Sequence, residues 1–85
     1  DIDPQGPTHV LVIPKQHIQS VNQIDDANKD IIAHIFTVIP KIASSEGIAE
    51  DGYRVVSNIG RRGQQTVPHL HFHIIGGRDM TWPPG

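Results

Sequence analysis

The feature that most constrains this chain is the alternation of histidine and apolar residues at positions 69–75, His-Leu-His-Phe-His-Ile-Ile. Side chains of a β-strand point alternately to its two faces, so this alternation predicts a strand. His69, His71 and His73 would share one face, with about 6.5–7 Å between successive members. The apolar residues between them would share the opposite face, which must therefore pack against another element.

An amphipathic helix earlier in the chain can cover that apolar face. Ile31, Ile35 and Ile42 recur at helical spacing, and the pattern predicts a helix from about residue 26 to Gly47, with acidic residues 25–26 at its start. Pro40 conflicts with this helix because proline lacks an amide donor and crowds the preceding turn. We predict one helix of about five turns that is kinked near residues 36–40, with a break into two helices as the alternative.

Two more segments have the composition of strands. Residues 8–13 are apolar and β-branched between two prolines, and residues 53–58 resemble them. Residues 59–66 form a polar loop with two glycines, and residues 78–85 form an irregular tail. The order strand, helix, strand, loop, strand predicts an α+β fold with an antiparallel sheet and the helix on one face. The length of 85 residues predicts a single domain, 1–85.

Composition excludes several classes of function. Seven Lys and Arg against nine Asp and Glu leave a net charge of −2, without the basic stripe that nucleic acids or anionic membranes need. No apolar run reaches the roughly 18 residues of a membrane span. The absence of cysteine excludes disulfides and thiolate chemistry, and it fits a cytoplasmic protein. A chain this short buries only about 60–65% of its unfolded surface, which favours pairing with a second chain.

Three functions fit a strand face that carries three histidines. The imidazoles could hold zinc, although the nearest downstream acid is Asp79, beyond two glycines. They could form a metal-free surface that responds to protons. One of them could be a nucleophile that its neighbours orient.

The loop before this strand favours the nucleophile. Asn58, Gln65 and Thr66 offer carboxamide and hydroxyl groups, and Gly60 and Gly63 leave backbone amides open to approach. Amides arranged in this way bind anions such as a phosphoryl group.

Together these motifs resemble the histidine triad (HIT) superfamily, specifically its Hint branch of purine nucleoside phosphoramidases. The resemblance rests on the histidine strand, the upstream Asn58, the Gly-Gly-Arg at 76–78 and the Trp-Pro-Pro-Gly at 82–85, and it covers essentially the whole chain. Members are longer at the N-terminus, where a helix and a hairpin precede the position of Asp1. The chain, which lacks an initiator methionine, is therefore expected to lack its natural beginning. The resemblance implies a HIT-like α+β homodimer.

The resemblance also implies roles for the histidines. His71 would attack the α-phosphorus and form a nucleotidyl-histidine. The backbone carbonyl of His69 would accept the Nδ1 proton of His71, so that Nε2 remains free to attack. His73 would contact phosphate oxygens, and His9 would bond to the cluster from the side.

Further positions follow from the same resemblance. Asn58, Gln65 and Thr66 would hold the phosphate and the leaving group. Asp1 would bind the ribose hydroxyls, and Ile2 would line the base pocket. Gln64 departs from the family, which commonly has a glycine there.

The implied activity is hydrolysis of the P–N bond of a purine nucleoside 5′-phosphoramidate without metal or cofactor. Trp82 would reach the active site of the partner subunit. Transferases of the superfamily carry Gln at the third triad position, so His73 favours hydrolysis. Two alternatives stay open: a dinucleoside polyphosphate hydrolase, and a non-catalytic purine nucleotide-binding or scaffolding dimer.

Overall fold

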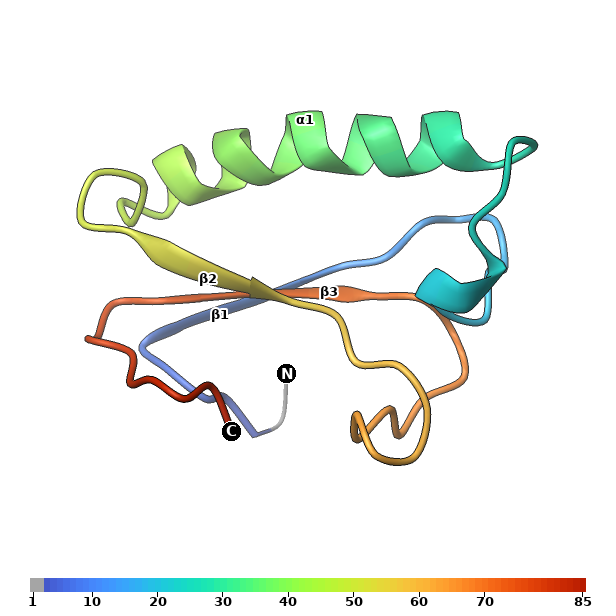
Figure 1. Cartoon of the computed structure of the whole chain (residues 1–85). Helices are drawn as coiled ribbons and strands as arrows, with labels where there is room; N and C mark the ends of the chain where they lie inside the picture. Colours follow the sequence, from blue (N-terminus) through green and yellow to red (C-terminus); the bar gives the residue numbers. More distant parts are fainter. Residues whose placement is uncertain (1–2) are drawn as a thin grey trace.

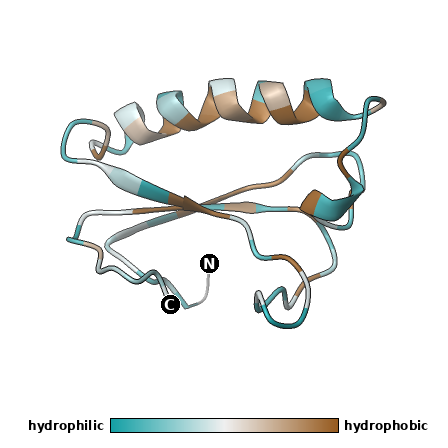
Figure 2. Cartoon of the chain, viewed as in Figure 1, coloured by the Kyte–Doolittle hydropathy of each residue, from teal (hydrophilic) through white to brown (hydrophobic). Residues whose placement is uncertain are grey.

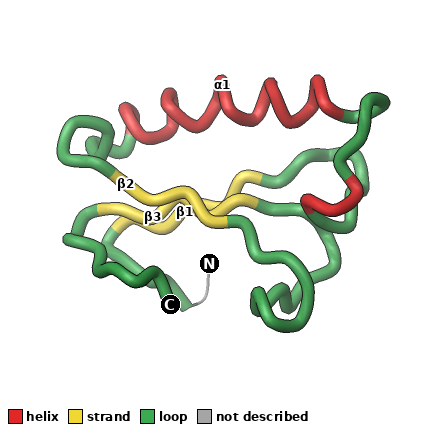
Figure 3. The backbone as a smooth tube through the Cα atoms, in the orientation of Figure 1, coloured by secondary structure: helices red, strands yellow, loops and turns green. Residues whose placement is uncertain are grey.

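The histidine-bearing segment supplies the central strand of a three-stranded antiparallel sheet. The structure, a computed structural model, describes residues 3–85. Strand β3 (Phe72–Gly76) lies between β1 (Thr8–Val12) and β2 (Tyr53–Val56), and the three strands are the yellow segments of Figure 3. His73 lies opposite Leu11 of β1 and Val56 of β2. The predicted antiparallel sheet is confirmed.

One helix, α1 (Lys29–Ser45), lies across one face of this sheet (Figure 1). Its buried residues are Ile35, Ile39 and Ala43, which form one core cluster with Phe72 and Ile74 of β3. In Figure 2 the hydrophobic side of α1 faces the sheet. The α+β arrangement and the predicted packing of the strand's apolar face against the helix are therefore confirmed. No helix within residues 3–85 has the length and apolar character to cross a bilayer.

The helix begins later than the sequence predicted. The Asp25 side chain accepts hydrogen bonds from the amides of Ala27 and Asn28, at 2.9 and 3.1 Å, so it caps a turn that precedes α1. Asp26 contributes only an exposed ion pair with Lys29 at 3.5 Å. The predicted start near residue 26 is wrong because this capped turn comes before the first helical residue.

Pro40 does not break α1, which runs as one helix from Lys29 to Ser45. The alternative of two helices is wrong, and Figure 1 shows no sharp bend at the predicted kink. Pro40 is exposed while Ile39 is buried, and Phe36 is half exposed, with its ring against that of Phe72 at a centroid distance of 5.4 Å. A carbonyl that loses its helical partner on the solvent side can bond to water instead, which makes this proline tolerable.

The central strand begins at Phe72, not at His69 as predicted. If the ladder continued, Leu70 would face Pro14, which has no amide to donate. The Leu70 amide instead donates to the carbonyl of Ile18 at 2.6 Å. His69 and His71 therefore lie in irregular backbone just before the strand, although Leu70 between them is buried in the same core cluster as Phe72 and Ile74.

We expect Ile74→Ala to lower the free energy of unfolding by about 2–5 kcal/mol, because it removes a fully buried side chain and leaves a cavity. The control is Ile13→Ala, since Ile13 is 52% exposed and its loss should cost within about 0.5 kcal/mol. Urea denaturation measures both values. Equal losses in the two variants would contradict this account of the core.

Candidate active site

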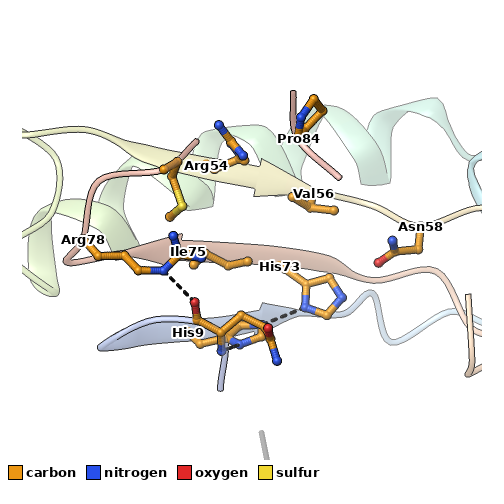
Figure 4. Close-up of a pocket in the computed structure, with 10 residues that line it drawn as sticks. His9, Arg54, Val56, Asn58, His73, Ile75, Arg78 and Pro84 are labelled. Carbon is orange, nitrogen blue, oxygen red and sulfur yellow. Dashed lines mark hydrogen bonds between the residues drawn. The ribbon is translucent and has the colours of Figure 1, made fainter. Parts of the chain in front are cut away.

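Three imidazoles converge on the sheet face opposite α1. His9 projects from β1, His73 from β3, and His71 from the residue before β3. The ring centroids of His9 and His73 are 5.0 Å apart, and those of His71 and His73 are also 5.0 Å apart. Figure 4 shows His9 and His73 turned toward one another. The cluster therefore joins an edge strand to the central one.

The hydrogen bonds assign a tautomer to two of these rings. The backbone amide of Gln5 donates to Nδ1 of His9 at 3.0 Å, so the proton of a neutral His9 is on Nε2. That Nε2–H donates to Nδ1 of His73 at 2.8 Å. A neutral His73 then carries its proton on Nε2 and can donate it to a ligand.

His71 receives the opposite assignment. Its Nδ1–H donates to the backbone carbonyl of His69 at 2.7 Å, which is the hydrogen bond that the resemblance implied. Nε2 of His71 therefore keeps its lone pair. The Ser57 hydroxyl donates to the carbonyl of His71 at 2.9 Å and holds the backbone of this residue. Ser57 has no signal in the sequence, because this contact depends on how β2 and β3 are paired.

His69 does not join the cluster of three rings. Its Nε2–H donates to the carbonyl of Pro14 at 3.1 Å, and its ring meets the edge of His17 at a centroid distance of 5.1 Å. His69 still lies on the same side of the chain as His71, because both rings line one hollow with Leu11, while Leu70 between them is buried in the core cluster. Within residues 3–85 no three His, Asp or Glu side chains are grouped to hold a metal ion, so the geometry gives the zinc hypothesis no support.

The loop after β2 is braced by its own carboxamides. Asn58 Nδ2 donates to the carbonyl of Gly63 at 2.6 Å, and the amide of Gly60 donates to Gln65 Oε1 at 3.3 Å. Nε2 of Gln65 donates to the carbonyl of Gln19 at 2.7 Å. The structure thus uses Gln65, expected at the phosphate, to tie the loop to the segment after β1. Thr66 is exposed.

Gln64 adopts a left-handed backbone conformation, with φ of 62°. A side chain in this conformation costs about 1–2 kcal/mol, and glycine avoids the cost. The departure noted in the sequence therefore falls at a position where glycine would be relaxed. Gly63, one residue earlier, cannot be replaced in the same backbone, because a Cβ would lie 2.3 Å from the carbonyl oxygen of Ile59.

A polar pocket of about 280 Å³ lies beside His9 and His73 (Figure 4). Two arginines line it. Arg54 donates to the carbonyl of Thr81 at 3.0 Å, and Arg78 donates to the carbonyl of Gln5 at 2.9 Å. The remaining lining residues are Gln5, Val56, Asn58, Ile75, Met80 and Pro84. Neither arginine was predicted as a site residue, and only the strand register brings Arg54 to this face.

A second, apolar hollow of about 200 Å³ lies on the other side of His71. Leu11, Ile13 and Val67 line it together with His69 and His71, and all three apolar side chains are exposed. Exposed apolar side chains that surround a hollow are typical of a ligand site.

Three further predicted site residues are Asp1, Ile2 and Trp82. Asp1 and Ile2 fall outside the described residues. Trp82 is 81% exposed, and the Arg54 guanidinium lies 5.9 Å from the centroid of its ring. Trp82 is thus close to the polar pocket, although it is not one of its lining residues.

A small α+β domain with clustered imidazoles beside a glycine-containing loop defines a class of protein, the histidine triad proteins. The HIT domain family model matches residues 1–80, and the chain belongs to this family. It is 46% identical, over all 85 residues and 74% of the relative's length, to an uncharacterised HIT-like protein of Synechococcus elongatus. It is 48% identical to a purine nucleoside phosphoramidase of Escherichia coli, over 94% of this chain and 67% of that one.

Solved structures agree with this assignment. The HIT family hydrolase of Legionella pneumophila superposes with a TM-score of 0.96 at 49% identity, over 100% of this chain and 76% of that one. A histidine triad protein of Clostridium difficile gives a TM-score of 0.90 at 44% identity, over 95% and 70%. The resemblance to the family that the sequence predicted is confirmed.

The local environment changes the titration of His73. Burial lowers the pKa of its imidazole below the ordinary value of 6.5, and charge on His71 and then on His9 lowers it further. Folded His73 therefore stays neutral to a lower pH than it does in the unfolded chain. Between the two pKa values the unfolded chain binds more protons, so the free energy of unfolding falls as the pH falls.

We expect His73→Gln to reduce this loss of stability, because the variant has no imidazole to titrate at that position. Urea denaturation at about pH 7.5 and about pH 5.5 measures the difference in the free energy of unfolding. His34→Gln, on the exposed side of α1, is the matched control and should retain the wild-type pH dependence. If the pH dependence were unchanged in His73→Gln, the loss of stability at low pH would not come from His73.

Proposed function

We propose that this chain hydrolyses the P–N bond of purine nucleoside 5′-phosphoramidates through a nucleotidyl-His71 intermediate, without a metal or cofactor. The observation that carries the proposal is the 2.7 Å hydrogen bond from Nδ1 of His71 to the carbonyl of His69. It leaves the Nε2 lone pair of His71 available beside a ring, His73, whose Nε2 carries a proton. A nucleophile next to a donor is the arrangement that phosphoryl transfer needs.

The reaction proceeds in two displacements. Nε2 of His71 attacks the α-phosphorus, the P–N bond to the amine breaks, and the amine takes a proton from water. The imidazolium so formed keeps its Nδ1–H on the carbonyl of His69, and this hydrogen bond strengthens as positive charge develops. Water then attacks phosphorus, the bond to His71 breaks, and the nucleoside monophosphate is released with a proton passing to solvent.

The two hollows flanking the histidines fit the two ends of such a nucleotide. We place the purine in the apolar hollow of Leu11, Ile13 and Val67, where Ile2 would add to the lining. The phosphoryl oxygens would bond to Nε2–H of His73, beside Asn58, which lines the same pocket. Thr66 would hold the leaving group. Arg54 and Arg78 raise the positive potential around the site, which favours an anionic substrate. Asp1 would bind the ribose hydroxyls.

A homodimer belongs to this proposal. Trp82 and Phe36 are 81% and 50% exposed, and large apolar side chains left in water are typical of an interface. Trp82 would then reach the partner's active site. The substrate and the second copy are the expected partners, with no role for nucleic acid or membrane. The name of the 48% identical E. coli relative, purine nucleoside phosphoramidase, supports the choice of reaction.

We expect His71→Ala to lower turnover of an adenosine phosphoramidate by at least about 10³-fold, because it removes the nucleophile. Mass spectrometry of the acid-quenched wild-type enzyme should find one added AMP on the peptide that carries His71. The variant should bind AMP with nearly unchanged affinity, which calorimetry measures.

Three results would decide against this mechanism. Full activity in His71→Ala would exclude the nucleophile. AMP binding by the wild type, with neither turnover nor labelled protein, would favour the scaffolding dimer. Loss of turnover with a chelator and its return with zinc would favour a metal enzyme.

A further inference from the structure

A third hollow on the described part of the chain is distinct from both histidine hollows. It measures about 550 Å³ and lies at the loop after β2. No carboxylate is among the described residues that line it, whereas one arginine is. The lining residues are Gln19, Gly60, Arg61, Gln64, Gln65, Thr66 and Pro68.

The backbone beneath this hollow is fixed by hydrogen bonds within the loop. The amide of Gln64 donates to the carbonyl of Arg61 at 3.1 Å, and the amide of Gln65 donates to the carbonyl of Gly60 at 3.0 Å. The Gln65 side chain anchors the loop to Gln19. Arg61 thus extends an exposed guanidinium from a braced turn, so that little backbone order is lost when an anion binds.

The hollow adjoins the site of the proposed reaction. Thr66 and Pro68 line it, while Val67 between them lines the apolar hollow together with His71. Residues 66–68 therefore form a shared wall with Arg61 on one side and the nucleophile on the other. Thr66 and Val67 are both exposed, so a flexible group can pass over this wall.

From this juxtaposition we propose that the hollow at Arg61 is a subsite for a leaving amine that carries a carboxylate. The inference rests on the proposed function and adds the class of amine. Guanidinium pairs with carboxylate through two parallel hydrogen bonds, which an uncharged amide cannot reproduce. Arg62, the exposed neighbour of Arg61, adds to the positive potential along the path of the amine.

The test compares two substrates that differ in one group. AMP is joined through a P–N bond to 4-aminobutyrate or to 4-aminobutyramide, whose amines lie far enough from the variable group to leave with similar ease. We expect kcat/KM to be about five- to tenfold higher for the carboxylate, and this preference should shrink as salt is added.

Variants of Arg61 test whether its side chain causes the preference for the carboxylate substrate. Arg61→Gln should bring the ratio of the two kcat/KM values close to one, and Arg61→Lys should restore part of it by returning the charge. Lys41→Gln removes an exposed positive charge of α1 and is the matched control. It should leave the ratio unchanged. Thermal denaturation of each variant confirms that it is folded.

The outcomes separate the two proposals. Turnover of both substrates with a wild-type ratio near or below one would overturn the subsite while the proposed function stands. A high ratio that survives Arg61→Gln would also overturn it. Turnover of neither substrate would overturn the proposed function and, with it, this inference.

Discussion

Burial of one face of β3 under α1 determines the geometry of everything else. Because the side-chain period of a strand is two, burying Phe72 and Ile74 against the helix forces His73 and Ile75 onto the opposite face. The register with β1 then brings His9 within hydrogen-bonding distance of His73. A shift of β3 by one residue would turn His73 toward α1 and turn Ile74 away from it. The same hydrophobic contact that stabilises the fold therefore positions the polar cluster.

The part of this structure that could be predicted from the sequence follows from the alternation of apolar and polar residues. It identified the central strand, the face that α1 covers, and the convergence of His71 and His73, because each depends only on local periodicity. The helix was identified by the same argument, although its start was misplaced by the Asp25-capped turn. Periodicity does not show where the hydrogen bonding between strands ends. The predicted strand therefore began too early, at His69.

The contacts that the sequence did not reveal are all long-range or made by the backbone. His69 turns to the carbonyl of Pro14, 55 positions away, and the Gln65 side chain bonds to the carbonyl of Gln19. Every peptide has a carbonyl, so no residue type marks the one that will accept a hydrogen bond. Arg54 reaches the histidine face only through its strand register. Pairing of the strands has to be known before such contacts can be inferred.

Three identical side chains obtain different chemistry from these backbone contacts. Nδ1–H of His71 donates a hydrogen bond to a backbone carbonyl, whereas Nδ1 of His73 accepts a hydrogen bond from Nε2–H of His9. One ring thereby presents a lone pair at Nε2 and its neighbour presents a proton, and the lowered pKa of His73 keeps that neighbour neutral. Backbone groups do not titrate near neutral pH, so the two tautomers stay distinct wherever the rings are neutral.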